Sequence, residues 1–511
     1  MSFQTRRISE KKGASRFLLR PFLKIFIGWI GILTRIVQRR HEEQETQKDY
    51  ERHTRLLKRV AIIIASLCIA ILLFVTVAKA LVALRVLSLD TIFSVAGNDL
   101  PRDIHGFTNF LLLGEGDSNH DGVDLTDTIM VASVDPRTKS VVLLSLPRDL
   151  YLLHTKKMGE GRINSLYRDY KGYLKANEGM REQEASQAAM RELGDEIGRT
   201  IDLTVHHIVK VDFIAFVQAV NAIGGVDIDV PYDIIDAEYP GPDYTYETFE
   251  IHKGLQHIDG ETALKYARSR HTTSDFDRSA RQQQLIQALG QKARDSGLAS
   301  SPGKITSLLR ILSAHVETTM SIPEIIGAAK LGRLVDQKNV LSMQLSDRNG
   351  LYGSPTDPGG FLYAPPREQF EGMSILLPVS IPEFPVTWKQ IRTLSHLLFQ
   401  NRGLTLSRPH ITILNASGIR GLASLLGDEL IRYGFTVART GNAPDKKKLP
   451  HAWIAPGSEA DESSAQFFGT LLHLAVKPLP KEFNEIAEPV TIILGKDYHY
   501  QPIQDLLPAS E

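Results

Sequence analysis

The sequence predicts a layered α/β fold: one domain of about 240 residues, a smaller C-terminal α/β unit, and one transmembrane helix before both. Three observations predict it. An uncharged apolar run covers residues 60–78, strand-like and helix-like patterns alternate from 106 to 345, and the alternation resumes at 408 after a stretch rich in Pro and Gly. The length of 511 residues also exceeds what a single hydrophobic core usually serves.

Composition limits the class of protein. The chain has 59 Lys and Arg, 59 Asp and Glu and 42% hydrophobic residues, which excludes a fully disordered or collagen-like chain. Residues 1–59 carry 15 basic and 6 acidic side chains, so the remainder is acidic and a uniformly basic nucleic-acid binder is disfavoured. Cys68 is the single cysteine, which excludes an intramolecular disulfide and a Cys-rich zinc site.

The apolar run predicts a membrane anchor. Its 19 residues span roughly 28 Å as a helix, and Lys58 and Arg59 precede it. We expect a basic cytoplasmic tail over 1–59, a transmembrane helix over 60–84, a spacer over 85–105 and an extracytoplasmic remainder. A cleaved signal sequence ending near Ala78-Lys79-Ala80 is the alternative. Residues 17–37 fit an interfacial amphipathic helix or a disordered basic tail equally well.

The main domain is predicted over 106–345. Expected strands are 110–113, 128–134, 140–146 and 226–230, with Asp135-Pro136 turning the second into the third as a hairpin. Expected helices are 180–200, 212–223, 277–295, 303–315 and 322–336. The acidic stretch 227–250, which has no Lys or Arg, is interpreted mainly as a solvated loop.

The C-terminal part is predicted to follow a linker. Pro and Gly become frequent from 351, so residues 346–407 are interpreted as a linker or loosely packed connection. A second α/β unit is expected over 408–500, with strands at 411–414 and 490–494, a turn at 415–418 and a helix at 420–433.

Three clusters of side chains carry candidate chemistry. Four arginines lie within 14 residues, namely Arg268, Arg270, Arg278 and Arg281. This density is typical either of a site that binds phosphate through several guanidinium groups or of a solvated basic helix. Five acidic residues follow the first strand, namely Glu115, Asp117, Asp121, Asp124 and Asp127. They could bind a Mg²⁺ ion that is shared with a substrate phosphate, or they could form a solvated acidic loop. Arg148 follows the third strand, at an edge where ligands often bind. No H-E-x-x-H pattern supports a zinc hydrolase.

Together these segments resemble the LytR-CpsA-Psr (LCP) family of bacterial cell-envelope enzymes. The matching segments are 109–114, 126–130, 144–149, 162–164, 222–227, 254–260, 263–270 and 275–282. The C-terminal unit resembles the accessory domain that follows this catalytic domain in many members, through segments 413–418 and 494–498. The resemblance implies an α-β-α catalytic domain with a central mixed sheet. It also implies a phosphotransferase that moves a glycopolymer from a polyprenyl-diphosphate carrier to peptidoglycan, at the membrane and without a nucleic-acid partner.

The resemblance also implies roles for individual residues. Asp127, with Asp117, would bind Mg²⁺ or another divalent cation, or Asp127 would orient the acceptor hydroxyl. Asp127, Arg148, Arg270 and Asp275 would be catalytic. The diphosphate would be held by Arg148, Arg162, Arg268, Arg270, Arg278 and Gln282.

Two positions depart from the family pattern. Gly116 stands where the family has an acid, and Leu125 stands where it commonly has Arg. These departures leave open a non-catalytic lipid-diphosphate or wall-binding protein. The same site with water as the acceptor would instead serve a hydrolase of polyprenyl diphosphates. A transcription attenuator is disfavoured, because the basic tail has no helix-turn-helix pattern and the arginines are predicted outside the cytoplasm.

Overall fold

The computed structural model describes residues 100–507, with gaps at 117–122, 152, 156, 242–244, 270–274, 298–304, 306–307, 309, 346–359, 380–386, 481–482 and 484–487. The predicted tail, transmembrane helix and most of the spacer lie outside the described residues. Within the described residues, no helix is both long enough and apolar enough to cross a membrane.

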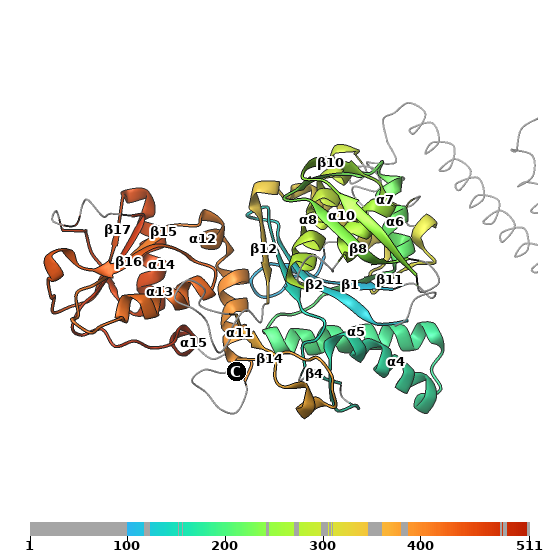
Figure 1. Ribbon diagram of the computed structural model, residues 1–511, viewed down its shortest axis with the longest axis horizontal. Coiled ribbons are helices and arrows are strands. Elements are labelled where there is room, and N and C mark those ends of the chain that lie inside the picture. Colours follow the sequence, from blue (N-terminus) through green and yellow to red (C-terminus); the bar gives the residue numbers. More distant parts are fainter. Residues whose placement is uncertain are drawn as a thin grey trace, which may run out of the picture. The chain divides into compact units, whose positions relative to one another are not determined.

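A six-stranded mixed sheet forms the centre of the first part of the chain, in the order β11-β6-β1-β2-β3-β12 (Figure 1). Its strands are β1 (Thr108–Glu115), β2 (Thr126–Asp135), β3 (Ser140–Leu146), β6 (His207–Val211), β11 (Val316–Thr318) and β12 (Val340–Gln344). β1, β2 and β3 are antiparallel neighbours, whereas β6 runs parallel to β1 and β12 parallel to β3. The predicted hairpin and the predicted central mixed sheet are confirmed.

Helices cover both faces of this sheet. Alternate side chains of β1 and β2, such as Leu111 and Val131, face a core shared with α4 (Ile163–Glu178) and α5 (Glu182–Ile201). Phe110 and Met130 face the opposite core, toward α8 (Asp275–Asp295) and α10 (Ile322–Leu334). Figure 1 shows the two helix layers on either side of the strands. The predicted α-β-α layering is confirmed, and burial on both faces explains why the strands are continuously apolar.

A satellite core packs beside the sheet around α6 (Phe213–Ala222) and α7 (Gly260–Arg268). Two strand pairs complete it: β7 (Val226–Val230) with β10 (Gly254–Ile258), and β8 (Ile234–Pro240) with β9 (Tyr246–Ile251). The predicted strand 226–230 is confirmed as β7, whereas the expectation of a long acidic loop over 227–250 is wrong, because β8 and β9 also lie in this stretch. In β7 the sequence VDIDV alternates buried Val and Ile with exposed Asp, so the acids occupy the solvent face of a strand.

Most of the stretch expected to be a loose linker is packed where the structure describes it. It contains β13 (Leu362–Tyr363), β14 (Leu377–Pro378), α11 (Lys389–Ser395), a π-helical turn (His396–Gln400) and α12 (Arg402–Ser407). Ile391, Leu394 and Phe399 are each at most 2% exposed in the same core as α5. Proline content misled the prediction, because apolar residues at helical spacing follow the last proline.

The C-terminal unit has a five-stranded sheet in the order β16-β15-β19-β17-β18. Its elements are β15 (His410–Asn415), α13 (Leu422–Arg432), β16 (Thr436–Asn442), β17 (Trp453–Pro456), α14 (Glu462–Leu472), β18 (Ala475–Val476), β19 (Val490–Leu494) and α15 (Ile503–Leu506). The predicted strands 411–414 and 490–494 and the predicted helix 420–433 are confirmed. The remaining short strands are β4 (Leu153–His154) and β5 (Glu160–Gly161).

Candidate active site

A cavity of about 160 Å³ lies where β2 begins and β3 ends. Asp127, Arg148, Arg278 and Gln282 all line it, together with Asp149. Four of the residues singled out in the sequence therefore come together, although they lie up to 155 positions apart in the chain. Asp127 and Arg148 come together because β2 and β3 are antiparallel: Ile129 is opposite Leu146, so the chain two residues before Ile129 faces the chain two residues after Leu146.

Both oxygens of the Asp127 carboxylate accept hydrogen bonds. Arg148 Nη1 donates to Oδ2 at 3.1 Å, and Asn164 Nδ2 donates to Oδ1 at 3.1 Å. The Asp127 side chain is nevertheless 46% exposed, so it is fixed in orientation while it remains open to the cavity.

Asn164 is a site residue that the sequence reasoning did not single out. It is 4% exposed at the start of α4, and its Oδ1 is buried without a hydrogen-bond partner. The one signal for Asn164 was its place in the segment 162–164, which matches the family pattern. The helix itself was not predicted, because charged residues separate its buried positions.

Asp149 is a second residue without a predicted role. Its Oδ1 lies 3.6 Å from Arg162 Nη1 and 4.0 Å from Arg148 Nε. One carboxylate thus lies beside two of the predicted anion-binding guanidiniums, and its side chain is only 16% exposed. Arg162 immediately precedes α4 and reaches the site region through this pair.

Helix α8 supplies Arg278 and Gln282 and is anchored on three sides. Gln282 Nε2 donates to Ala267 O at 3.4 Å, and Gln283 Nε2 donates to Ser145 Oγ and to Met343 O, each at 2.8 Å. Arg281, buried and 4% exposed, donates from Nε to Tyr266 O at 2.8 Å. These bonds fix the helix against α7, β3 and β12, so Arg278 is held at the cavity.

Arg268 lies in a different place from the other predicted anion ligands. Its guanidinium carbon is 4.3 Å from the Phe213 ring centroid and 5.5 Å from that of Tyr239. It lines a separate groove of about 450 Å³ between α6 and α7. Asp117 and Arg270 lie outside the described residues. Asp275 is the first residue of α8, and its side chain lies outside the described part.

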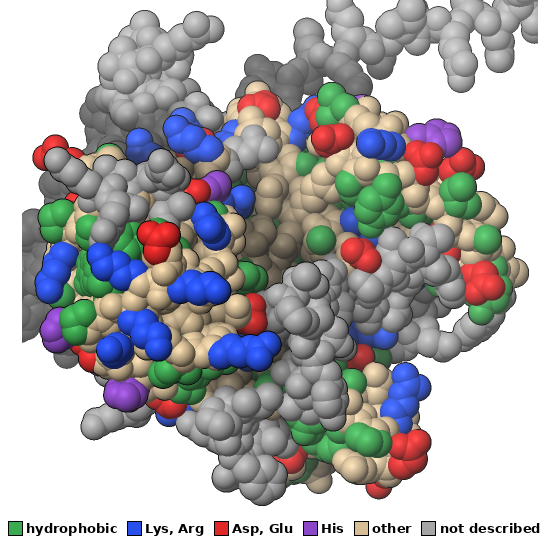
Figure 2. Space-filling model, turned by 60° about the vertical axis from the view of Figure 1, so that its left-hand side comes forward, with side chains coloured by type: hydrophobic (Ala, Val, Ile, Leu, Met, Phe, Trp, Pro, Cys, Tyr) green, Lys and Arg blue, Asp and Glu red, His purple; other side chains and the backbone are tan. Residues whose placement is uncertain are grey.

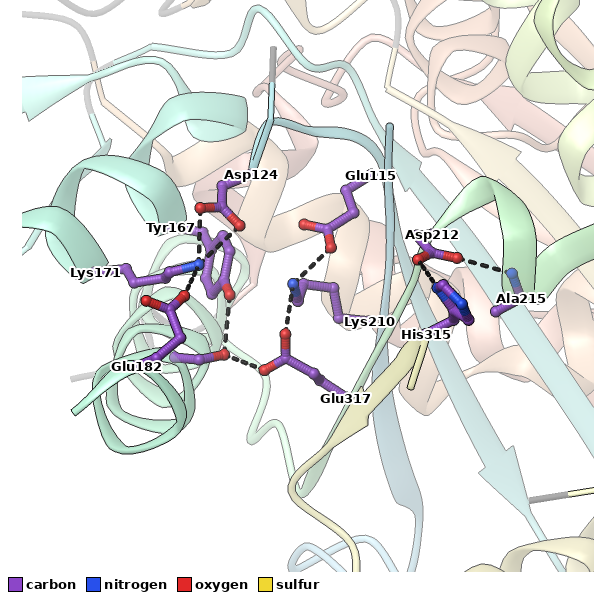
Figure 3. A network of polar contacts seen from close by, with 11 residues as sticks. Glu115, Asp124, Tyr167, Lys171, Glu182, Lys210, Asp212, Ala215, His315 and Glu317 are labelled. Carbon is purple, nitrogen blue, oxygen red and sulfur yellow. Dashed lines mark hydrogen bonds and ion pairs between the residues drawn. The ribbon is translucent and has the colours of Figure 1, made fainter. Parts of the chain in front are cut away.

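The two acids nearest the departures from the family pattern pair with lysines (Figure 3). Glu115 Oε1 is 2.7 Å from Lys210 Nζ, and Asp124 Oδ2 is 2.7 Å from Lys171 Nζ. Both lysines lie against the Tyr167 ring, at 4.7 Å for Lys210 and 5.6 Å for Lys171. Neither acid lines the cavity that contains Asp127.

Charge pairing controls the ionisation of this network. Burial raises the pKa of Glu115, and Lys210 opposes that shift. Burial disfavours the charged forms of Lys210 and Lys171, but the neighbouring carboxylates outweigh it and hold both lysine pKa values above the usual range. Hydrogen bonds from Lys171 and Lys175 lower the pKa of Glu182 to about 2.

The described residues do not form a preassembled metal cage. No group of three His, Cys, Asp or Glu side chains within the described ranges is arranged to hold a metal ion. Asp127 contributes one partly exposed carboxylate, beside two guanidiniums that suit phosphate. Since protein-bound Mg²⁺ commonly uses one or two carboxylates together with substrate phosphates, this donor set fits a cation shared with a phosphate-bearing ligand.

A mixed sheet between two helix layers, with a cavity lined by two arginines and two aspartates, is typical of proteins that bind phosphate groups. The sequence profile of the LytR_cpsA_psr family matches residues 94–360, and the chain belongs to this family. A second profile, described as LytR cell envelope-related transcriptional attenuator, matches residues 408–498.

Several relatives have names that refer to cell wall biosynthesis. The chain is 25% identical over 421 residues to "Cell wall biosynthesis protein LcpA" of Corynebacterium glutamicum, covering 79% of this chain and 76% of the relative. It is 30% identical over 203 residues to the polyisoprenyl-teichoic acid–peptidoglycan teichoic acid transferase TagV of Bacillus subtilis, covering 39% of this chain and 46% of TagV. The match to TagV thus spans less than half of that relative.

Solved structures resemble the chain at lower identity. The crystal structure of B. subtilis TagV aligns with a TM-score of 0.40 at 22% identity and covers 57% of this chain and 96% of that chain. A structure of TagT bound to LI-WTA aligns with a TM-score of 0.40 at 19% identity and covers 59% of this chain and 93% of that chain.

Proposed function

We propose that this protein is a phosphotransferase of cell wall biogenesis that moves a glycopolymer from a polyprenyl-diphosphate carrier to peptidoglycan. The observation that carries the proposal is the cavity in which Asp127 lies beside Arg148 and Arg278. Family membership and relatives named as transferases support the same activity.

The chemistry requires positioning and charge stabilisation rather than a protein nucleophile. The acceptor hydroxyl oxygen attacks the phosphorus that carries the glycan, and the bond from that phosphorus to the bridging oxygen breaks. The polyprenyl phosphate leaves with the electron pair. Arg148 and Arg278 stabilise the developing negative charge, and Asp127 accepts the proton of the attacking hydroxyl.

A divalent cation such as Mg²⁺, held by Asp127 and the diphosphate, would neutralise further negative charge. Arg162 and Arg270 complete the proposed diphosphate set, with Gln282 beside them. Arg268 lines the separate groove between α6 and α7 and is left out of the set. Asp117 is the second proposed metal ligand, and Asp275 orients the arginines. Asn164 and Arg148 together fix the rotamer of Asp127, so its position is set before substrate binds.

The anchor and the location belong to the same proposal. A transmembrane helix over 60–84 with an extracytoplasmic catalytic domain would keep the active site beside a lipid-linked donor. Protease added to intact cells whose wall has been removed should digest the domain after residue 85 and leave the tail over 1–59. A tail digested from outside, with the domain protected, would contradict this topology.

The activity is tested with the full chain, a labelled polyprenyl-diphosphate glycan and peptidoglycan fragments. We expect label on the fragments, its loss with EDTA and its return with Mg²⁺. Arg278→Lys keeps the charge but loses the planar fork, so transfer should fall about 100-fold. Arg137→Lys, at a side chain 79% exposed, is the matched control and should transfer normally.

Other outcomes identify the alternatives. Carrier cleavage at the same rate with and without acceptor would show a lipid-diphosphate hydrolase. Donor binding that depends on Arg278, without turnover, would show a binding protein and would mean that Gly116 and Leu125 have cost the activity.

A further inference from the structure

A second positively charged surface lies at the carboxyl end of the C-terminal sheet, far along the chain from the candidate active site. The parallel strands β16, β15 and β19 end at Asn442, Asn415 and Leu494, next to one another in the sheet. In open α/β sheets this edge is the usual place for ligands, because the connecting loops and helix N-termini meet there.

Backbone hydrogen bonds hold the loops of this edge together. Ala443 N donates to Asn415 O at 3.0 Å, Leu449 N to Ala416 O at 2.9 Å, and Lys496 N to Leu449 O at 2.9 Å. The segment 443–449 therefore crosses the end of β15 and reaches the turn after β19. The position of this segment is therefore set by backbone hydrogen bonds to the ends of the strands.

Six cations lie on these loops and on β16, and all are exposed. They are Arg420, Arg439, Lys446, Lys447, Lys448 and Lys496, which we name the basic edge. Lys448 lies over the turn after β15, since a methyl group placed on Gly418 would be 2.8 Å from its Cε. Figure 2 shows Lys and Arg side chains outnumbering Asp and Glu on the side of the C-terminal unit that faces the viewer.

Local acids do not neutralise the basic edge. Apart from Lys447, none of its members lies within 4.0 Å of a carboxylate among the residues described. Two acids lie close in sequence, Asp445 and Asp497, and Asp497 is engaged by His451 at 2.9 Å and by the Ala452 N–H at 2.7 Å. Helix α13 adds positive potential, because its N-cap is Gly421, which has no side chain to satisfy the first N–H groups.

We propose that the basic edge binds a polyanionic, phosphodiester-linked glycopolymer. Exposed like charges that lie close together repel one another, and a flexible polyanion relieves that repulsion while the cations of the protein displace the counterions of the polymer. Exposed lysines in a loop suit a repeating phosphate chain better than a single buried anion, which would need a closed pocket. The choice of a glycopolymer among polyanions rests on the proposed function, since such a polymer would be the cargo of the transfer.

The test measures binding of the full chain to poly(glycerol phosphate) of defined length, with uncharged dextran of the same length beside it. We expect poly(glycerol phosphate) binding that weakens steadily with salt, and no dextran binding. Lys446→Gln/Lys447→Gln/Lys448→Gln should weaken binding about tenfold and lower the salt slope. Arg102→Gln/Lys253→Gln/Lys477→Gln removes the same charge at exposed positions elsewhere and should leave binding unchanged.

Three results would overturn the proposal: equal binding of dextran, equal losses in the two triple variants, or tighter binding of single-stranded DNA or phosphatidylglycerol vesicles than of the glycopolymer. Transfer of a single sugar phosphate from a lipid diphosphate to peptidoglycan fragments separates this proposal from the proposed function. Salt-sensitive polymer binding without transfer would support the basic edge and refute the transferase. Transfer without polymer binding would support the transferase and refute the basic edge.

Discussion

At the scale of single residues, the candidate site depends on how the Asp127 carboxylate is held. Two side chains donate hydrogen bonds to it, and Asn164 is the uncharged one and is only 4% exposed. A hydrogen bond to a charged group typically contributes about 1.5–3 kcal/mol, and here the bond sets the direction of the carboxylate rather than its burial. Asn164 therefore acts through Asp127 as a positioning residue.

Asn164→Ala should lower kcat about 10- to 100-fold and leave the Tm nearly unchanged. Water can replace the lost donor at the half-exposed Asp127, but it cannot fix the carboxylate direction. Steady-state kinetics of the variant gives its kcat, and thermal unfolding gives its Tm. Asn177→Ala, at an exposed amide on the same helix, is the control and should change neither.

Asn164→Asp tests the same contact by pH. A second carboxylate in place of the donating amide repels the Asp127 carboxylate, and a proton shared between the two relieves that repulsion. The acid limb of the pH–rate profile should therefore move to higher pH in this variant. An unshifted acid limb would show that Asp127 is not the group whose ionisation limits the rate.

At the scale of elements, the ion pairs of the buried Lys210 tie β6 to β1 and to β11. Lys210 is 2% exposed between Glu115 and Glu317, so its removal leaves the buried Glu115 without compensation. Lys210→Met should destabilise the fold by about 3–5 kcal/mol. Lys175→Met, at a side chain 46% exposed, should cost less than about 1 kcal/mol.

The Lys210→Met deficit should depend on pH. Burial already raises the folded-state pKa of Glu115 above its unfolded value, and loss of Lys210 raises it further. An acid with a raised folded pKa opposes folding once it ionises, so the deficit should be larger at pH 8 than at pH 5. Glu115→Gln in the same background should remove that difference, as followed by urea unfolding at both pH values.

The anchoring of α8 gives a matched pair of glutamines. Gln283→Met leaves Met343 O and Ser145 Oγ without their buried donor and should cost about 1–3 kcal/mol. Gln287→Met removes a more exposed bond to Ser342 Oγ and should cost less than half as much. Equal losses in urea unfolding would mean that Gln283 does not hold the helix.

The sequence predicted elements whose pattern matches their burial. β1, β2 and β3 are buried on both faces and are therefore continuously apolar. It failed where acidic residues on the exposed face of a strand hide the alternation, as in β8 and β9, or where buried polar side chains such as Lys171 interrupt an apolar stripe. Asp127, Arg148 and Arg278 could be selected by residue type, whereas Asn164 and Asp149 act through tertiary contacts that no local pattern records.

At the scale of the whole molecule, the folding unit extends beyond the family match. That match ends at residue 360, yet Arg392 on α11 donates from Nη2 to Arg199 O on α5 at 3.0 Å. Arg402 donates to Ser133 O at 3.0 Å and to Ser133 Oγ at 2.9 Å on β2. Residues 389–407 thus complete the core of the preceding domain.

This arrangement predicts the result of truncation. A chain of residues 94–379 lacks five side chains that are each at most 3% exposed, namely Ile391, Leu394, Leu397, Leu398 and Phe399. Each contributes about 1.5–3 kcal/mol on burial, so their summed loss is comparable to the whole stability of a typical domain. We expect this chain to aggregate in size-exclusion chromatography.

A chain of residues 94–407 should remain monomeric, because it keeps α11 and α12 and loses only the contacts of the C-terminal unit, such as Tyr433 against Phe361 at 5.2 Å between ring centroids. Its thermal transition should lie below that of a chain of residues 94–511, since that apolar contact also contributes. If 94–379 folds as stably as 94–407, the helices after residue 389 are accessory, and the packed segment serves only to join the two sheets.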